Sequence, residues 1–149
     1  MILAGALLGA LLMIVAEFTT LYQVHLATSS EPIKSVSGGS NHSYAMIPLA
    51  IVAAALAVAV VRTGSRPALL AIGVLGVVAL LIGLLIDLHD AQASGIATRQ
   101  FVLASSTPSA GLYMETLGAV LLIATCGLGF LMLGPTGSAS TPRRSRPAA

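Results

Sequence analysis

Four long runs of apolar residues dominate the chain, and short polar segments separate them. The runs cover residues 2–21, 45–61, 68–88 and 112–133. Each has roughly 17 to 22 residues, enough for a helix rising about 1.5 Å per residue to cross a hydrocarbon core of about 30 Å. No run alternates like a strand, and only a helix satisfies its own backbone in lipid. The pattern therefore predicts an all-α membrane protein built as a bundle of four transmembrane helices.

The composition supports this class. Of the 149 residues, 56% are hydrophobic and only 8% are charged, whereas about 25% of the residues in a soluble domain are charged. Disorder of the whole chain is excluded, because a disordered chain needs low hydrophobicity and high charge. The lipid bilayer is thus the first expected partner. Cys126 is the only cysteine, which excludes an intramolecular disulfide and CxxC chemistry.

The basic residues indicate the orientation. Five of the seven fall on one side of the predicted bundle, in the turn between the second and third runs and in the tail: Arg62, Arg66, Arg143, Arg144 and Arg146. By the positive-inside rule, both termini are then cytoplasmic. We expect a transmembrane domain at residues 1–133 and a disordered basic cytoplasmic tail at 134–149. The few arginines are interpreted as topology signals, so no nucleic acid is expected as a partner.

Two longer loops, at residues 22–44 and 89–111, face outward in this topology. Residues 33–36 and 98–103 have some strand character, and Ser-Ser-Thr-Pro after the second segment is typical of a turn. The two segments form either a small outer β-layer or irregular loops. One alternative applies to the first run, which could be a cleaved signal peptide; three helices would then remain.

Small residues mark the helix faces where close packing is expected. In the first run, glycines recur every four residues in line with Glu17. In the third run, glycines share a stripe with Asp87, and in the fourth a glycine follows Glu115 on the same face. The predicted packing residues are Gly5, Gly9, Gly76, Gly83 and Gly118. The three acids therefore point into the bundle.

All five acids and all three histidines belong to the outward half of the molecule. A charge within the membrane costs about 2.5 to 3.5 kcal/mol, less near the interface, so Glu17 needs a polar partner or a proton. The acids act either as a polar clamp between helices or as a site for a ligand, a proton or a partner. The candidate ligand- or partner-binding residues are Glu17, His42, Asp87, His89, Asp90 and Glu115.

Metal binding or catalysis would have to use the same acids and histidines. Carboxylates with imidazole suit zinc, manganese or iron, and residues 87–90 place two carboxylates and one imidazole close together. However, no HExxH motif is present, and the sequence identifies neither a metal nor a cofactor. GxSxG, the P-loop and a GxGxxG after a strand are also absent. We name no catalytic residue and expect a protein that is not an enzyme.

The segment Gly111-Leu-Tyr-Met-Glu-Thr-Leu-Gly118, which opens the last run, resembles small uncharacterised four-pass membrane proteins of actinobacteria. The resemblance implies a multi-pass protein of a bacterial plasma membrane and carries no activity with it. From size and the missing motifs, we expect an accessory or scaffold subunit of a larger membrane complex, bound to membrane-protein partners or to copies of itself. The alternative is a small transporter or an ion- or metal-binding protein that uses the outward Glu/Asp/His cluster.

Overall fold

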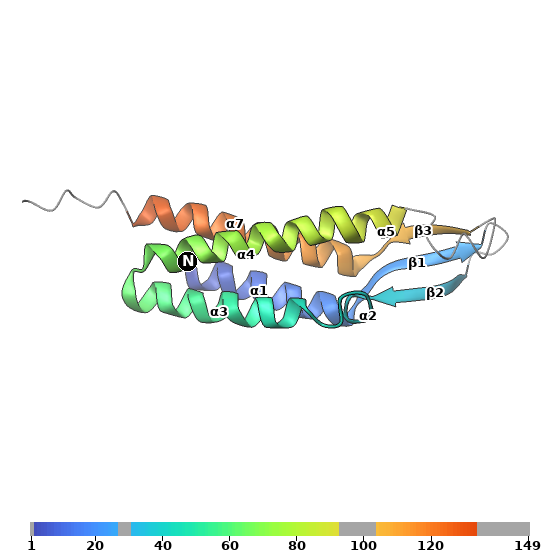
Figure 1. The fold of residues 1–149 in the computed structure, drawn as a ribbon, viewed down its shortest axis with the longest axis horizontal. Helices are drawn as coiled ribbons and strands as arrows, with labels where there is room; N and C mark the ends of the chain where they lie inside the picture. Colours follow the sequence, from blue (N-terminus) through green and yellow to red (C-terminus); the bar gives the residue numbers. More distant parts are fainter. Residues whose placement is uncertain (1, 27–30, 93–103, 134–149) are drawn as a thin grey trace, which may run out of the picture.

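The protein is mostly helical. The computed structural model describes residues 2–26, 31–92 and 104–133. The long helices in this part are α1 (Ile2–Phe18), α3 (Met46–Thr63), α4 (Arg66–Ile82) and α7 (Ala110–Met132). They lie side by side along the long axis of the molecule (Figure 1), with α1 and α4 each packed against both α3 and α7. We call the end of these helices that carries the β-strands the sheet end, and the opposite end the turn end.

Among the described residues, three helical segments are long and apolar enough to cross a membrane: α3, the continuous stretch Arg66–Asp87 and α7. Helix α1 is apolar as well but has only 17 residues. Large apolar side chains are exposed along these helices. Such a surface is unfavourable in water and suits a lipid environment.

A tight turn joins α3 to α4 at the turn end. Helix α3 ends at Thr63 and is followed by Gly64, whose φ of 65° is left-handed. The amide of Gly64 donates to the carbonyl oxygen of Val60 at 2.8 Å. Ser65 then caps α4, because its hydroxyl accepts a hydrogen bond from the amide of Ala68. Arg66 donates to the carbonyl oxygen of Leu133 after α7, where a cation is favoured by the helix dipole.

Short elements extend the helices at the sheet end. The π-helix η1 (Gly83–Asp87) continues α4, and α5 (Leu88–Gln92) follows it. The predicted span 68–88 is therefore part of a longer helical stretch that contains one wide turn. On the other side of the molecule, α2 (Gly38–His42) precedes α3. Figure 1 shows α2 at the junction between the helices and the strands.

A three-stranded antiparallel sheet completes this end. Its strands are β1 (Thr20–Leu26), β2 (Pro32–Ser37) and β3 (Ala104–Pro108), in the order β2-β1-β3. In the central strand, Val24 is paired with Lys34 on one side and with Ser106 on the other. A second, small core lies beneath the sheet, formed by Leu21, Ala91 and Leu112.

The sheet corrects three expectations. Of the two alternatives for residues 33–36, the structure shows the strand, within β2, so the chain is mostly helical rather than all-α. The first helix does not run to Leu21: it ends at Phe18, because the hydroxyl and the amide of Thr19 both turn back to the carbonyl oxygen of Ala16. Ser-Ser-Thr-Pro, predicted as a turn, lies in β3. The strand predicted at 98–103 and the tail at 134–149 lie outside the described residues.

Small side chains allow the long helices to pack closely. The core between them is rich in alanine, including Ala6, Ala50, Ala53, Ala57 and Ala119. The closest approach joins α1 to α7, where a Cβ atom built on Gly9 would lie 2.8 Å from the carbonyl oxygen of Gly118. Only glycine fits such a contact between backbones.

Candidate functional site

Three of the predicted acids are buried at the sheet end, one on each of three helical segments. Glu17 of α1 is 2% exposed, Asp87 of η1 is 0% exposed and Glu115 of α7 is 1% exposed. Each of these side chains thus points into the protein. Burial of ionisable side chains is expensive, so each needs an account of what it contacts.

The helix register places the three acids at nearly the same height. Helices α1 and α7 are antiparallel, with Gly9 against Gly118 and Gly111 against Thr19, so Glu17 is level with about residue 113. Gly83 lies against Thr116 of α7, which sets Asp87 level with about residue 112. The three acids therefore fall within about one helical turn, roughly 5 Å along the axis. We call Glu17, Asp87 and Glu115 the acid layer.

Glu17 caps a neighbouring helix. Its Oε1 accepts a hydrogen bond of 2.9 Å from the amide of Met46, the first residue of α3, and the interaction is buried. Ala45, the residue before α3, has no side chain that could cap the helix. A carboxyl group at this position satisfies one of the free N–H groups and interacts favourably with the helix dipole. Oε2 of Glu17 is also buried but has no hydrogen-bond partner among the described residues.

Asp87 holds α2. Its Oδ1 accepts a hydrogen bond of 2.8 Å from the side-chain amide of Asn41. At the start of the same short helix, Gly38 lies so close to α1 that a Cβ atom there would be 2.9 Å from Cα of Glu17. Helix α2 therefore spans the gap between two members of the acid layer, and both fix its position.

Glu115 lies against the π-helix. A Cβ atom at Gly83 would be 3.6 Å from Oε1 of Glu115, an ordinary van der Waals distance, so the carboxyl group lies directly beside the start of η1. Asp87 is the last residue of the same π-helix. Asp87 and Glu115 both take part in further polar interactions. A π-turn inside an α-helix often occurs at a functional site, and here it faces the acid layer.

Of the remaining candidates, only His89 has a described side chain. His89 is exposed on α5, and the side chains of His42 and Asp90 lie outside the described residues. Within the described part of the chain, no three His, Cys, Asp or Glu side chains are placed to hold a metal ion. Among the side chains that the structure describes, the candidates brought together are Glu17, Asp87 and Glu115, with Glu17 bound to a backbone amide and Asp87 to an asparagine.

The sequence did not point to Asn41 or to the amide of Met46. Asn41 is a polar loop residue 46 positions from its partner, and no periodic pattern marks it. The signal that could have identified the cap is Ala45: a helix start without Ser, Thr, Asp or Asn needs its acceptor from elsewhere.

The predicted packing glycines lie at helix contacts. A Cβ atom at Gly5 would meet the hydroxyl of Thr125 of α7 at 2.6 Å, and one at Gly76 would lie 2.9 Å from the carbonyl oxygen of Ala119. Together with the contact of Gly9 and Gly118, these positions show that α7 packs by small residues against α1 on one side and α4 on the other.

Aromatic residues surround the acid layer at the surface. Phe18, Tyr44 and Tyr113 are 67%, 51% and 64% exposed, and the rings of Phe18 and Tyr44 contact each other with centroids 6.0 Å apart. All three lie at or next to the sheet-end termini of α1, α3 and α7. In a membrane protein, such residues are typical of the lipid–water interface.

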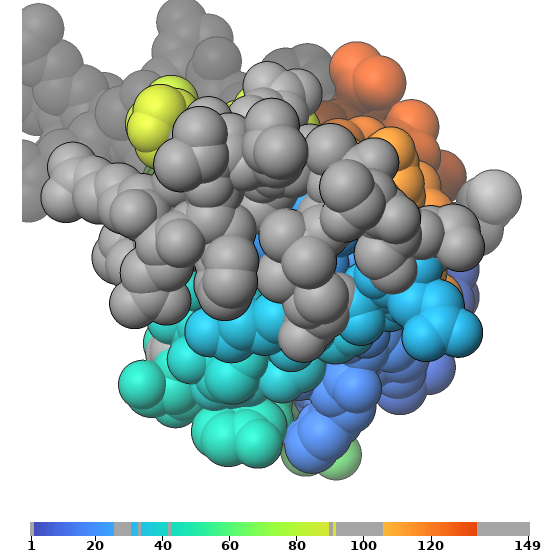
Figure 2. All heavy atoms as spheres, turned by 90° about the vertical axis from the view of Figure 1, so that its right-hand side faces the viewer, coloured from blue at the N-terminus to red at the C-terminus, as the bar shows by residue number. Residues whose placement is uncertain are grey.

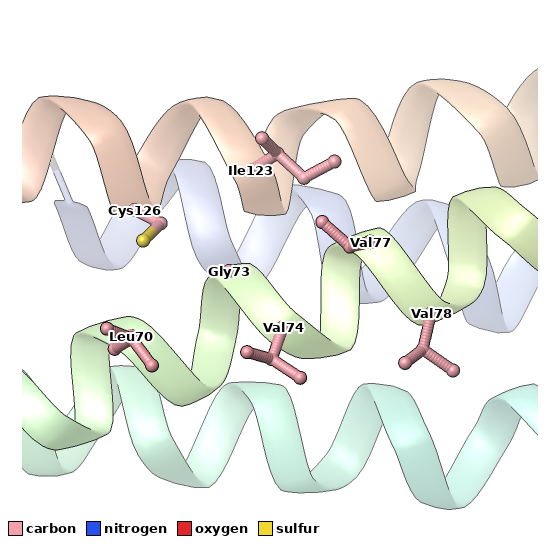
Figure 3. Close-up of a pocket in the computed structure, with 7 residues that line it drawn as sticks. All are labelled: Leu70, Gly73, Val74, Val77, Val78, Ile123 and Cys126. Carbon is pink, nitrogen blue, oxygen red and sulfur yellow. The ribbon is translucent and has the colours of Figure 1, made fainter.

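A shallow apolar groove lies between α4 and α7, away from the acid layer (Figure 3). Gly73 and Cys126 form part of its lining, and the other residues are Leu70, Val74, Val77, Val78 and Ile123. It offers no polar group apart from the thiol. The groove is therefore suited only to apolar groups.

No family model, curated protein or solved structure matches the chain. What the site can do is accordingly argued from its geometry.

Proposed function

We propose that the protein crosses a membrane as a four-helix bundle, with both termini inside and the sheet end outside. The aromatic residues support this placement, since Tyr113 lies 20 residues before Leu133 at the end of α7, a rise of about 30 Å that matches a hydrocarbon core. The turn end carries Arg62 and Arg66, consistent with the positive-inside rule. The proposed location is the plasma membrane of a bacterium, in line with the resemblance of its last helices.

We further propose that this protein is a non-enzymatic accessory or scaffold subunit of a larger membrane complex. The observation that carries the proposal is how the buried acids are used: Glu17 caps α3 and Asp87 binds Asn41 of α2. These bonds fix the loop between β2 and α3 beside a small sheet. Acids that act in this way hold the loop in one predominant arrangement, so the sheet end presents a defined surface to a partner outside the membrane.

Cross-linking in native membranes tests this function. A photoreactive residue at Lys34, which is exposed on β2, should give one discrete product with a partner or with a second copy of the chain. The same residue at Thr63, which is exposed at the turn end, serves as the control and should not give that product. The product at Lys34 should disappear in Glu17→Ala and persist in Glu17→Gln. A chain without a discrete cross-link at the sheet end contradicts the proposal.

One observation favours the second candidate, a small transporter or an ion-binding protein. Oε2 of Glu17 is buried without a hydrogen-bond partner in the described structure, and such an oxygen can accept a water, a proton or a small cation. In this case Glu17→Gln and Asp87→Asn should each remove cation-dependent uptake into vesicles or cation-dependent stabilisation. If both variants behave as the parent protein does, this candidate is excluded.

A further inference from the structure

The segment between β2 and α3, residues 38–45, has a strained backbone. After α2, both Ser43 and Tyr44 have positive φ angles, 52° and 61°. Residues other than glycine rarely adopt this left-handed conformation, because the Cβ atom crowds the backbone there, and each one destabilises the segment. Two such residues in succession persist only where surrounding contacts hold the chain.

Two members of the acid layer supply those contacts. Asp87 binds Asn41 in the middle of the segment, and Glu17 binds the amide of Met46 just after its end. At its start, the amide of Gly38 donates to the carbonyl oxygen of Thr19 at 3.3 Å. Three hydrogen bonds thus hold the segment on the side that faces the protein interior.

The opposite side of the same segment is exposed at the surface. Ser43, Tyr44 and Ala45 are all exposed. Figure 2 faces the sheet end, and the turquoise region that follows β2 forms part of the surface there. The segment therefore lies between solvent on one side and buried carboxyl groups on the other.

The closed arrangement also leaves a buried oxygen of Glu17 unsatisfied. In the part of the chain that the structure describes, Oε2 of Glu17 has no hydrogen-bond partner, although the side chain is only 2% exposed. A buried acceptor without a partner is destabilising, because it has lost its hydrogen bonds to water and gained none within the protein. Admission of water would remove this cost and would release the strain at Ser43 and Tyr44, while closure gains the two hydrogen bonds to the acids.

From this balance we propose that residues 38–45 form a lid, which opens toward the aqueous side of the sheet end and admits water to the acid layer. In the structure the lid is closed, and hydrogen bonds to Glu17 and Asp87 hold it in place. The open form is a minor state, reached while the four long helices stay packed. This inference does not rest on the accessory role proposed above, since a lid would serve a scaffold and a transporter alike.

Hydrogen exchange of the full-length protein in lipid nanodiscs tests the lid. The amide of Met46 should exchange through local opening, faster than the amides of Ala53 and Ala57 in the middle of α3. Asn41→Ala removes the hydrogen bond to Asp87 and should accelerate exchange at Met46 by up to about tenfold, because the closed lid then loses one of the bonds that hold it. Exchange at Ala53 should not change.

The substitution Ser43→Gly should have the opposite effect. Glycine adopts positive φ without strain, so it favours the closed lid and should slow exchange at Met46 several-fold. Thr63→Ala, at the far end of α3, is the matched control and should leave exchange at Met46 unaltered. A protein whose Met46 and Ala53 exchange together, or whose Met46 responds to neither Asn41→Ala nor Ser43→Gly, has no such lid.

A second measurement tests what the lid covers. A membrane-impermeant, water-soluble carbodiimide should label Glu17, Asp87 or Glu115 slowly in the parent protein and several-fold faster in Asn41→Ala, as located by mass spectrometry. Exposed Glu31 provides the internal reference, whose labelling should stay constant. Faster exchange at Met46 without faster labelling of the acid layer would overturn the proposal that the lid gives access to these acids.

Discussion

The contacts at the two ends of the helices differ in how far apart the bonded residues lie in the sequence. At the turn end, the caps of the connection are local: Gly64 bonds to Val60 and Ser65 caps the amide of Ala68. One longer-range bond there, of 3.4 Å, joins Arg66 to Leu133. At the sheet end, contacts join distant segments. Glu17 reaches an amide 29 residues away, and Asp87 reaches an asparagine 46 residues away.

The two kinds of contact differ in how much they stabilise the protein and in when they form during folding. Local caps at a partly exposed turn contribute about 1 kcal/mol each, and they form as soon as the adjoining helix does. Buried long-range bonds contribute more, because their loss leaves a polar group without water. They also form only once the helices have packed. We therefore expect substitutions at the sheet end to cost more stability than equivalent ones at the turn end.

The largest effect is expected for Glu17→Ala. The substitution leaves the buried amide of Met46 without an acceptor and opens a cavity, and it should lower the free energy of unfolding by about 3 kcal/mol. Glu17→Gln keeps a carbonyl oxygen for the same amide and should cost less than about 1 kcal/mol. Reversible unfolding in mixed micelles measures both values. Equal losses in the two variants would show that the acid does not act as a helix cap.

A pair of glycines compares the two ends directly. Gly38→Ala would bring a Cβ atom within 2.9 Å of Cα of Glu17 and within 3.0 Å of the carbonyl oxygen of Ala16, so the backbone must shift, at a cost of about 2 kcal/mol. At Gly64, a Cβ atom meets nothing within 4 Å. Gly64→Ala therefore costs only the strain of its left-handed φ, about 1 kcal/mol.

The same unfolding measurement applies to both glycine variants. Gly38→Ala should in addition accelerate hydrogen exchange in α2, whereas Gly64→Ala should affect only the turn. A cost at Gly64 equal to or above that at Gly38 contradicts the expected order of the two ends.

The contrast also explains what the sequence could predict. Long apolar runs and the Arg62–Pro67 turn are local patterns, and the helices α3, α4 and α7 lie close to their predicted positions. Helical spacing likewise pointed the acids inward, and Glu17, Asp87 and Glu115 are buried. These features follow from residues three or four positions apart, which single-sequence periodicity records.

Most of the sheet end could not be predicted in this way. Strand β1 begins within the apolar run assigned to the first helix, and β3 consists of residues that usually form turns. Their strand conformation depends on pairing with segments far away in the sequence, as when Val24 pairs with Lys34 and Ser106. The partners of the acids, Asn41 and the amide of Met46, depend on the same long-range packing.

The smallest effect is expected for Ser65→Ala at the turn end. The hydroxyl of Ser65 accepts a hydrogen bond of 3.4 Å from the amide of Ala68, a long bond at a partly exposed site, and its loss should cost 1 kcal/mol or less, about the usual value for a helix cap. Pro67 in the first turn of α4 still favours the helix start, and water can reach the freed amide. The unfolding midpoint in mixed micelles should therefore shift only slightly, and exchange at Met46 should not change. A loss as large as that of Glu17→Ala would mean that the local turn, rather than the buried acid layer, limits the stability of the molecule.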